Sequence, residues 1–221
     1  MNTTVCRRLF REKMAAFDPR RYATERALGL YSAAVTLADG ELMTGCIRLG
    51  ERHGVTREML YEIVLQSYLF LGFPRMLNAA ENLADVHPYQ YRETELKPVE
   101  RRESQEWFDD GMTLCRKVYG QKYDSLIQRV SSLAPEVSRW MIIEGYGKVL
   151  SRPGLDIVSR ELSIVAFLIM ENREKQLHSH MMGAVNVGTP TELIASLVGD
   201  IGESAGDGFK TARRLLEGIK P

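Results

Sequence analysis

The sequence predicts an all-α fold. Apolar residues recur three or four positions apart along most of the 221 residues, and no segment shows the alternation typical of a half-buried strand. Glycines close several of these periodic stretches. Gly54 and Gly188 each follow one directly, and a glycine in that place suits the left-handed conformation that ends many helices. We therefore expect helices to supply the whole core.

The expected helices follow one another through short turns. In the first half they cover residues 5–16, 20–38, 40–53, 57–71 and 74–85. In the second half they cover residues 99–118, 122–132, 135–150, 156–171, 174–187, 190–202 and 206–218. The run Thr189-Pro190-Thr191-Glu192 matches a capping box with proline in the first turn, so a sharp helix start is expected there.

A polar segment with a proline near each end, His87 to Pro98, separates the two halves. We expect residues 1–90 to form a first helical unit, residues 91–98 a linker, and residues 99–221 a second unit.

The two halves resemble each other at an offset of 134 positions, the distance in sequence from Gly54 to Gly188. In this alignment both copies have the same order of features: a glycine that ends a helix, a threonine near the next N-cap, a glutamate in the first turn, and a helix with periodic apolar residues. We interpret this self-match as a tandem duplication. The offset also aligns the following residues: Glu58 with Glu192, Gly72 with Gly206, Arg26 with Arg160, and Cys46 with His180.

Composition narrows the function classes. Lys plus Arg and Asp plus Glu are both 29, so there is no basic surplus to neutralise phosphates, and no nucleic-acid partner is expected. The longest apolar run, Ile164 to Met170, is too short to span a bilayer, and the N-terminal residues lack an apolar signal core. Three scattered cysteines fit a reducing compartment. We expect a cytoplasmic protein without a membrane partner.

The chemistry-bearing stretch runs from Tyr146 to Gly188. It reads YGKVLSRPGLDIVSRELSIVAFLIMENREKQLHSHMMGAVNVG. An Arg-Pro-Gly-Leu-Asp turn leads into a helix that opens with Arg160 and Glu161, and the next helix carries His178 and His180. Residues two apart on a helix face different ways, so one of the two histidines is expected to point inward. No third ligand lies nearby in sequence, so no metal site is expected.

This stretch resembles the core of the carboxymuconolactone decarboxylase family, which includes the alkylhydroperoxidase D-like proteins. GMTLCRKVYG and WMIIEGYGKVLSRPGLD are similar to the true lactone decarboxylases. The thiol-active branch carries a Cys-x-x-Cys pair seven and four residues before its histidine. Here those positions are Arg173 and Gln176, and the first copy has Asp39 and Leu42 before Cys46. The resemblance therefore argues against a thiol peroxidase.

The resemblance implies two tandem copies of an alkylhydroperoxidase D-like helical unit, assembled as a homo-oligomer such as a trimer or a hexamer-like ring. It also selects a proton relay, since Glu161 and His180 have the 19-residue spacing of the family's Glu–His pair. The implied activity is a cofactor-free lyase acting on a small anionic lactone or related acid. His180 would be the general acid and Glu161 would orient it.

Arginine side chains suit the carboxylate that such a substrate retains, and Arg160 and Arg152 flank the Pro-Gly turn. The alternatives stay open. Glu161 and the arginines can simply brace the turn, and His180 can be a core histidine. The protein would then be a non-catalytic, oligomeric binding or assembly member of the family. Cys6, Cys46 and Cys115 receive no role.

Overall fold

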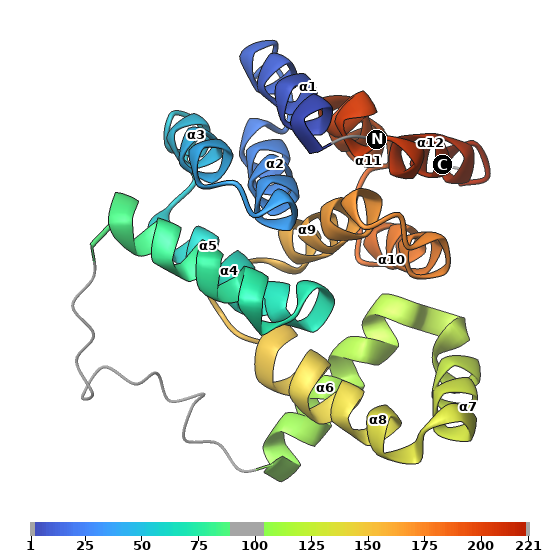
Figure 1. Ribbon diagram of the computed structural model, residues 1–221. Coiled ribbons are helices and arrows are strands. Elements are labelled where there is room, and N and C mark those ends of the chain that lie inside the picture. The colour runs from blue at the N-terminus through green and yellow to red at the C-terminus, as the bar shows by residue number, and fades with distance from the viewer. Residues whose placement is uncertain (1–2, 89–103, 220–221) are drawn as a thin grey trace.

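The computed structural model describes residues 3–88 and 104–219, and within them it confirms the all-α prediction (Figure 1). The first half contains α1 Thr3–Ala15, α2 Ala23–Leu37, α3 Gly40–Glu51, α4 Arg57–Leu71 and α5 Phe73–Val86. The second half contains α6 Ser104–Tyr119, η3 Gly120–Lys122, α7 Tyr123–Leu133, α8 Pro135–Trp140, η4 Met141–Leu150, α9 Ile157–Met170, α10 Glu174–Asn186, α11 Thr191–Ile201, η5 Gly202–Ala205 and α12 Asp207–Glu217. The expected linker, residues 91–98, and residues 99–103 of the expected sixth helix lie outside the described residues.

Local signals set several helix starts. The side chains of Asp39 and Thr56 accept hydrogen bonds from the first turns of α3 and α4. Gly54 and Gly188 have φ angles of +84° and +100°, as expected of the residues that stop α3 and α10. The predicted capping box before α11 is wrong. Pro190 occupies the cap without a side-chain bond, and the buried hydroxyl of Thr189 has no hydrogen-bond partner in the described part of the chain.

The predicted helix 135–150 changes its winding at Met141. Its second part, η4, is a π-helix, a wide form that is rare and is often found at functional sites. It packs along α6 with the two backbones nearly touching (Figure 1). A Cβ added at Gly111 of α6 would lie 2.1 Å from the carbonyl oxygen of Ile142, and one at Gly147 would lie 1.8 Å from that of Trp107. Only glycines permit this approach.

Helices α2 and α9 form the centre of the molecule (Figure 1). Each packs against the other, and each also packs against both α4 and α11. Buried apolar side chains of both halves join one continuous core. The two predicted units therefore share their interior, and neither could be removed without exposing the other. Among the helices of residues 3–88 and 104–219, none is long and apolar enough to cross a membrane.

Helix starts repeat at the offset seen in the sequence. The first residues of α2, α3, α4 and α5 are each 134 positions before those of α9, α10, α11 and α12. Helices α6 and α7 have no counterpart in the first half at this offset. The packing follows the same repeat, since α4 and the equivalent α11 each contact both α2 and the equivalent α9.

Two buried arginines at equivalent positions tie the halves together. Arg26 of α2 donates from Nε and Nη2 to the carboxylate of Asp200 on α11, both at 2.6 Å. Arg160 of α9 donates from Nη1 to Gln66 of α4 at 3.2 Å. Gln66 lies 134 positions before Asp200, so the two partners are also equivalent in the repeat. Each arginine therefore bonds the equivalent residue on a helix of the other half.

Arg160 also takes part in a buried charge network around Glu62 of α4. The Glu62 carboxylate is fully buried and accepts from Arg160 Nη2 at 3.0 Å and from Arg152 Nε at 3.1 Å. Arg160 Nη2 also donates to the carbonyl of Arg152 at 2.8 Å. This network attaches the turn before α9 to the first half of the chain.

Replacement of Glu62 by glutamine is expected to lower the free energy of unfolding by about 3 kcal/mol, because it leaves two arginines facing each other without their buried counter-charge. Urea unfolding followed by circular dichroism measures the change. Glu81→Gln on the exposed face of α5 is the matched control and should change stability by less than about 0.5 kcal/mol. Equal effects of the two variants would show that the network is not a stabilising element.

Candidate functional site

The turn before α9 places the acidic residue of the site. Gly154 has a φ angle of +97°, and a Cβ there would lie 3.0 Å from Glu58 of α4. Asp156 then caps the helix by accepting from the backbone N–H of Ser159 at 3.0 Å. The helix therefore begins at Ile157, so Glu161 lies in its second turn. The sequence had suggested that Arg160 and Glu161 open the helix.

The structure brings Glu161 and His180 together. Glu161 Oε2 lies 2.9 Å from His180 Nδ1, and only 1% and 7% of the two side chains are exposed. Helices α9 and α10 pack side by side, and this packing brings two residues that are 19 positions apart in sequence into contact. His178, two residues earlier, is exposed, so the two histidines do face different ways.

Aromatic rings surround the imidazole of His180. Phe70 of α4 meets its ring edge-on at a centroid distance of 5.6 Å, and Tyr119 of α6 does so at 6.2 Å. Nε2 of His180 makes no hydrogen bond within the described residues. It is also not fully enclosed, so it keeps some accessible surface. If Nδ1 carries the proton toward Glu161, Nε2 is left as the ring nitrogen that can exchange a proton with an incoming group.

The polar cluster around Glu161 is larger than the sequence indicated. Cys115 and Tyr119 of α6 and Tyr146 of η4 all lie within electrostatic range of the Glu161 carboxylate. Burial, reinforced by that carboxylate, raises the pKa of the Cys115 thiol and of the Tyr119 phenol to about 12 each. Burial raises the pKa of Tyr146 well above its ordinary range as well. All three groups are neutral near pH 7 and can serve as weak donors.

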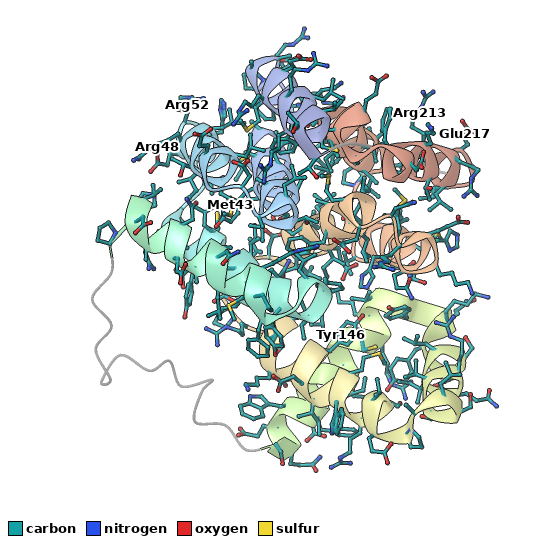
Figure 2. All side chains as sticks on the ribbon, viewed as in Figure 1. Met43, Arg48, Arg52, Tyr146, Arg213 and Glu217 are labelled. Atoms are coloured by element: carbon teal, nitrogen blue, oxygen red, sulfur yellow. The ribbon has the colours of Figure 1, made fainter. Side chains whose placement is uncertain are left out.

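Tyr146 depends on the π-helix for its position. It is labelled in Figure 2, on η4, which packs against α6 and α4, and it is buried with its ring against that of Tyr119. The sequence did not single out Tyr119 or Tyr146. The one available signal was the i, i+4 spacing of Cys115 and Tyr119, which places both on one face of α6.

Glu161 has unused hydrogen-bonding capacity. Its Oε1 is buried and has no partner among the described residues. A buried carboxylate oxygen without a donor is costly, so it favours a donor that enters the cluster. No group of three or more His, Cys, Asp or Glu side chains suited to a metal ion occurs in residues 3–88 or 104–219.

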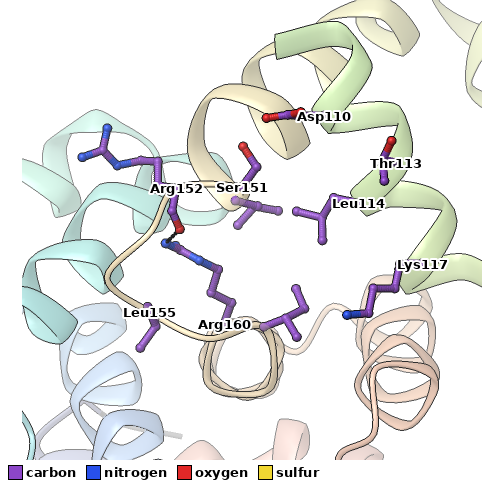
Figure 3. Close-up of a pocket in the computed structure, with 10 residues that line it drawn as sticks. Asp110, Thr113, Leu114, Lys117, Ser151, Arg152, Leu155 and Arg160 are labelled. Carbon is purple, nitrogen blue, oxygen red and sulfur yellow. Dashed lines mark hydrogen bonds between the residues drawn. The ribbon is translucent and has the colours of Figure 1, made fainter. Parts of the chain in front are cut away.

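Arg152 and Arg160 lie elsewhere. They line an open hollow of about 330 Å³ between α6, the end of η4 and the start of α9 (Figure 3). Glu161 and His180 are not among its lining residues. The structure therefore brings the two arginines together at Glu62 and the acid–histidine pair together in the cluster, but it does not place all four on one hollow.

The first half lacks the acid–histidine pair. At the offset of 134, Ala27 occupies the place of Glu161 and Cys46 that of His180. Cys46 is buried, and its Sγ lies 3.1 Å from Sδ of Met14, so it packs as a small apolar side chain. At these equivalent positions, therefore, the second half carries an acid–histidine pair and the first half does not.

Gly183→Ala is expected to destabilise the protein by about 1–3 kcal/mol, because the added methyl would lie 2.7 Å from Val118 and 3.0 Å from Glu161 Oε2. Gly199→Ala is the control: its Cβ would meet nothing within 4 Å, and alanine favours a helix interior by about 1 kcal/mol. Melting temperatures should shift in opposite directions. A neutral Gly183→Ala would mean that α10 does not press against Glu161 in solution.

No dithiol-dependent peroxide reduction is expected. Burial raises the pKa of both Cys46 and Cys115, that of Cys115 to about 12, so their thiols remain protonated and unreactive at pH 7–9. Iodoacetamide labelling at pH 8 should modify Cys6 first and leave the other two until urea unfolds the chain. Peroxide turnover that vanishes in Cys46→Ser or Cys115→Ser would contradict this assignment.

Comparison with known proteins finds a distant likeness. No protein-family model matches the chain. Among curated proteins, the chain is similar to peroxisomal protein 2 of Schizosaccharomyces pombe, with 24% identity over 138 residues. The match covers 62% of this chain and 64% of that protein, so the chain spans less than two-thirds of its relative.

Proposed function

We propose that the Glu161–His180 pair is the proton-transfer centre of a cofactor-free lyase that acts on a small anionic lactone or related acid. The observation that carries the proposal is the 2.9 Å contact between Glu161 Oε2 and His180 Nδ1 inside the core. The resemblance of residues 146–188 to the lactone decarboxylases supplies the reaction class.

The proposed reaction breaks the bond between a carbon and its carboxylate. Carbon dioxide leaves, and the electron pair moves into the conjugated lactone carbonyl. His180 takes up a proton from solvent at Nε2, and the resulting imidazolium, which Glu161 stabilises, delivers that proton to carbon and returns to the neutral ring with its proton on Nδ1. The edges of Phe70 and Tyr119 limit water around the ring, which strengthens its interaction with Glu161.

Arg160 and Arg152 are proposed to hold the carboxylate that the substrate retains. Both already bond Glu62, so this role requires a substrate that shares the guanidinium groups with that carboxylate.

A non-catalytic binding or assembly protein is the second candidate. The separation of the arginine-lined hollow from Glu161 and His180 favours it, because a lyase needs its clamp and its acid on one substrate. A thiol peroxidase is disfavoured by the absence of a Cys-x-x-Cys pair and by the burial of Cys46 and Cys115.

We also propose that the two halves are tandem copies of an alkylhydroperoxidase D-like unit. The 134-residue repeat of four helix starts and the equivalent packing of α4 and α11 against both α2 and α9 support this. We place the protein in the cytoplasm because of its unpaired cysteines, with neither nucleic acid nor membrane as partner. The distant relative is named as peroxisomal, and fluorescence imaging of the tagged chain distinguishes the two locations.

His180→Ala should reduce lactone turnover by about 100-fold to 10,000-fold, the usual contribution of a general acid. Glu161→Gln should reduce it less, because glutamine can still accept from Nδ1. His178→Ala is the matched control and should be nearly silent, since its ring is exposed. Turnover of 4-carboxymuconolactone and the melting temperature of each variant are measured together.

The two measurements separate catalysis from packing. Loss of turnover at an unchanged melting temperature supports the acid–base role. Full activity in His180→Ala, or no turnover of the lactone by the parent protein, contradicts the lyase assignment and leaves the binding or assembly protein.

A homo-oligomer is expected, most simply a trimer. The resemblance implies this, while Ile63 and Val64 of α4 are buried within the chain and cannot form a subunit contact. The exposed apolar side chains of this region are Tyr61, Phe73 and Leu77 on α4 and α5. Light scattering should give a multiple of 25.1 kDa, and a clean 25.1 kDa particle would contradict the expectation.

A further inference from the structure

The phenols of Tyr119 and Tyr146 form a pair beside the acid–histidine cluster. Their rings meet edge-on at a centroid distance of 6.2 Å, and their hydroxyls lie within hydrogen-bonding reach of each other. Neither hydroxyl has another hydrogen-bond partner among residues 3–88 and 104–219. Two phenols carry two hydroxyl protons, and their mutual hydrogen bond uses one of them. One O–H is therefore left to donate elsewhere.

Burial decides which of the two protons stays free. Tyr146 is only 4% exposed, whereas Tyr119 on α6 is partly exposed. A buried O–H without an acceptor is costly, so the arrangement in which Tyr146 donates to Tyr119 is favoured. The proton left over then belongs to Tyr119, the more accessible of the two phenols.

The free O–H of Tyr119 lies beside the imidazole of His180. The two rings meet edge-on at a centroid distance of 6.2 Å, and Nε2 of His180 keeps some accessible surface. The carboxylate of Glu161 does not consume this O–H, because its buried Oε1 has no hydrogen-bond partner in the described part of the chain. A group that enters next to the imidazole can therefore meet both Nε2 and the Tyr119 hydroxyl.

The proposed decarboxylation needs a donor in this place. When carbon dioxide leaves, negative charge develops on the oxygen of the lactone carbonyl, and a preorganised donor at that oxygen stabilises the transition state. Burial raises the pKa of Tyr119 to about 12, so its phenol keeps the proton at pH 7 and can donate a hydrogen bond. The bond that Tyr119 accepts from Tyr146 polarises its own O–H and makes it a stronger donor.

We propose that Tyr119 is a catalytic residue that donates a hydrogen bond to the dienolate oxygen of the substrate, and that Tyr146 is a positioning residue that orients and polarises Tyr119. The inference rests on the proposed lyase function and names the group that stabilises its intermediate. The electron pair of the broken bond ends on the carbonyl oxygen, where Tyr119 meets it. His180 then protonates carbon, the carbonyl forms again, and Tyr119 keeps its proton throughout.

Steady-state turnover of 4-carboxymuconolactone by the full chain tests this pair. Phenylalanine is the informative replacement, because it removes a hydroxyl and keeps the ring. Tyr119→Phe should lower kcat by about 100-fold to 1,000-fold and change KM by less than about 3-fold, since the lost bond forms fully only in the transition state. Tyr146→Phe should lower kcat by only about 10-fold, because Tyr119 can still donate.

Tyr31→Phe is the matched control. Tyr31 is a buried tyrosine of α2 whose hydroxyl has no hydrogen-bond partner in the described residues, so its removal should change neither kcat nor the melting temperature appreciably. The double variant separates action through Tyr119 from a loss of packing. With both hydroxyls removed, kcat should be no lower than in Tyr119→Phe alone, because Tyr146 acts only through Tyr119.

The inference is overturned, and the lyase stands, if the parent chain turns over the lactone and Tyr119→Phe keeps its kcat. It is also overturned if the two single effects multiply in the double variant, or if Tyr119→Phe changes KM alone. If Tyr119→Phe is unfolded at the assay temperature, Tyr146→Phe decides, and an unchanged kcat in that variant overturns the pair. A parent chain that does not turn over the lactone overturns the lyase and this inference together.

Discussion

The buried carboxylate of Glu62 is the constraint on which the arrangement of α9 depends. It accepts from Arg152 in the turn before the helix and from Arg160 in its second turn, so both residues are attached to α4 of the other half. Removing these three charges from water costs several kcal/mol, which only close mutual contacts can offset. The network therefore fixes the position of α9, and with it that of Glu161, the next residue after Arg160.

The arrangement separates two kinds of chemistry by one residue along α9. Arg160 bonds Glu62 and lines the open hollow between α6 and α9. Glu161 faces the other way, toward His180 and the cluster that contains Tyr119 and Tyr146. Burial keeps the phenols and the Cys115 thiol neutral, so the acid–histidine pair is the group of that cluster suited to move a proton near pH 7.

Much of this fold was predictable from local sequence. Caps and glycine stops act within one turn, so the starts of α3, α4 and α10 agree with the predicted helices. The contact of Glu161 with His180 was expected from the resemblance stated above, because the two residues have the 19-residue spacing of that family's Glu–His pair. Long-range partners were not predictable: Arg160 finds Glu62 98 residues away, and no local rule links them. The π-helix depends on the tight approach of α6, and so the position of Tyr146 was also missed.

The proposed proton transfer requires one tautomer of the neutral His180 ring. In this tautomer Nδ1 carries the proton and donates it to Glu161, and Nε2 is free to take up a proton and pass it to an incoming group. Long-range ¹⁵N NMR of the ring nitrogens measures this directly, with His180→Gln assigning the signals. The account predicts that the neutral ring of His180 has its proton on Nδ1 and a bare Nε2, while exposed His178 averages between tautomers. A proton on Nε2 of the neutral His180 ring would contradict it.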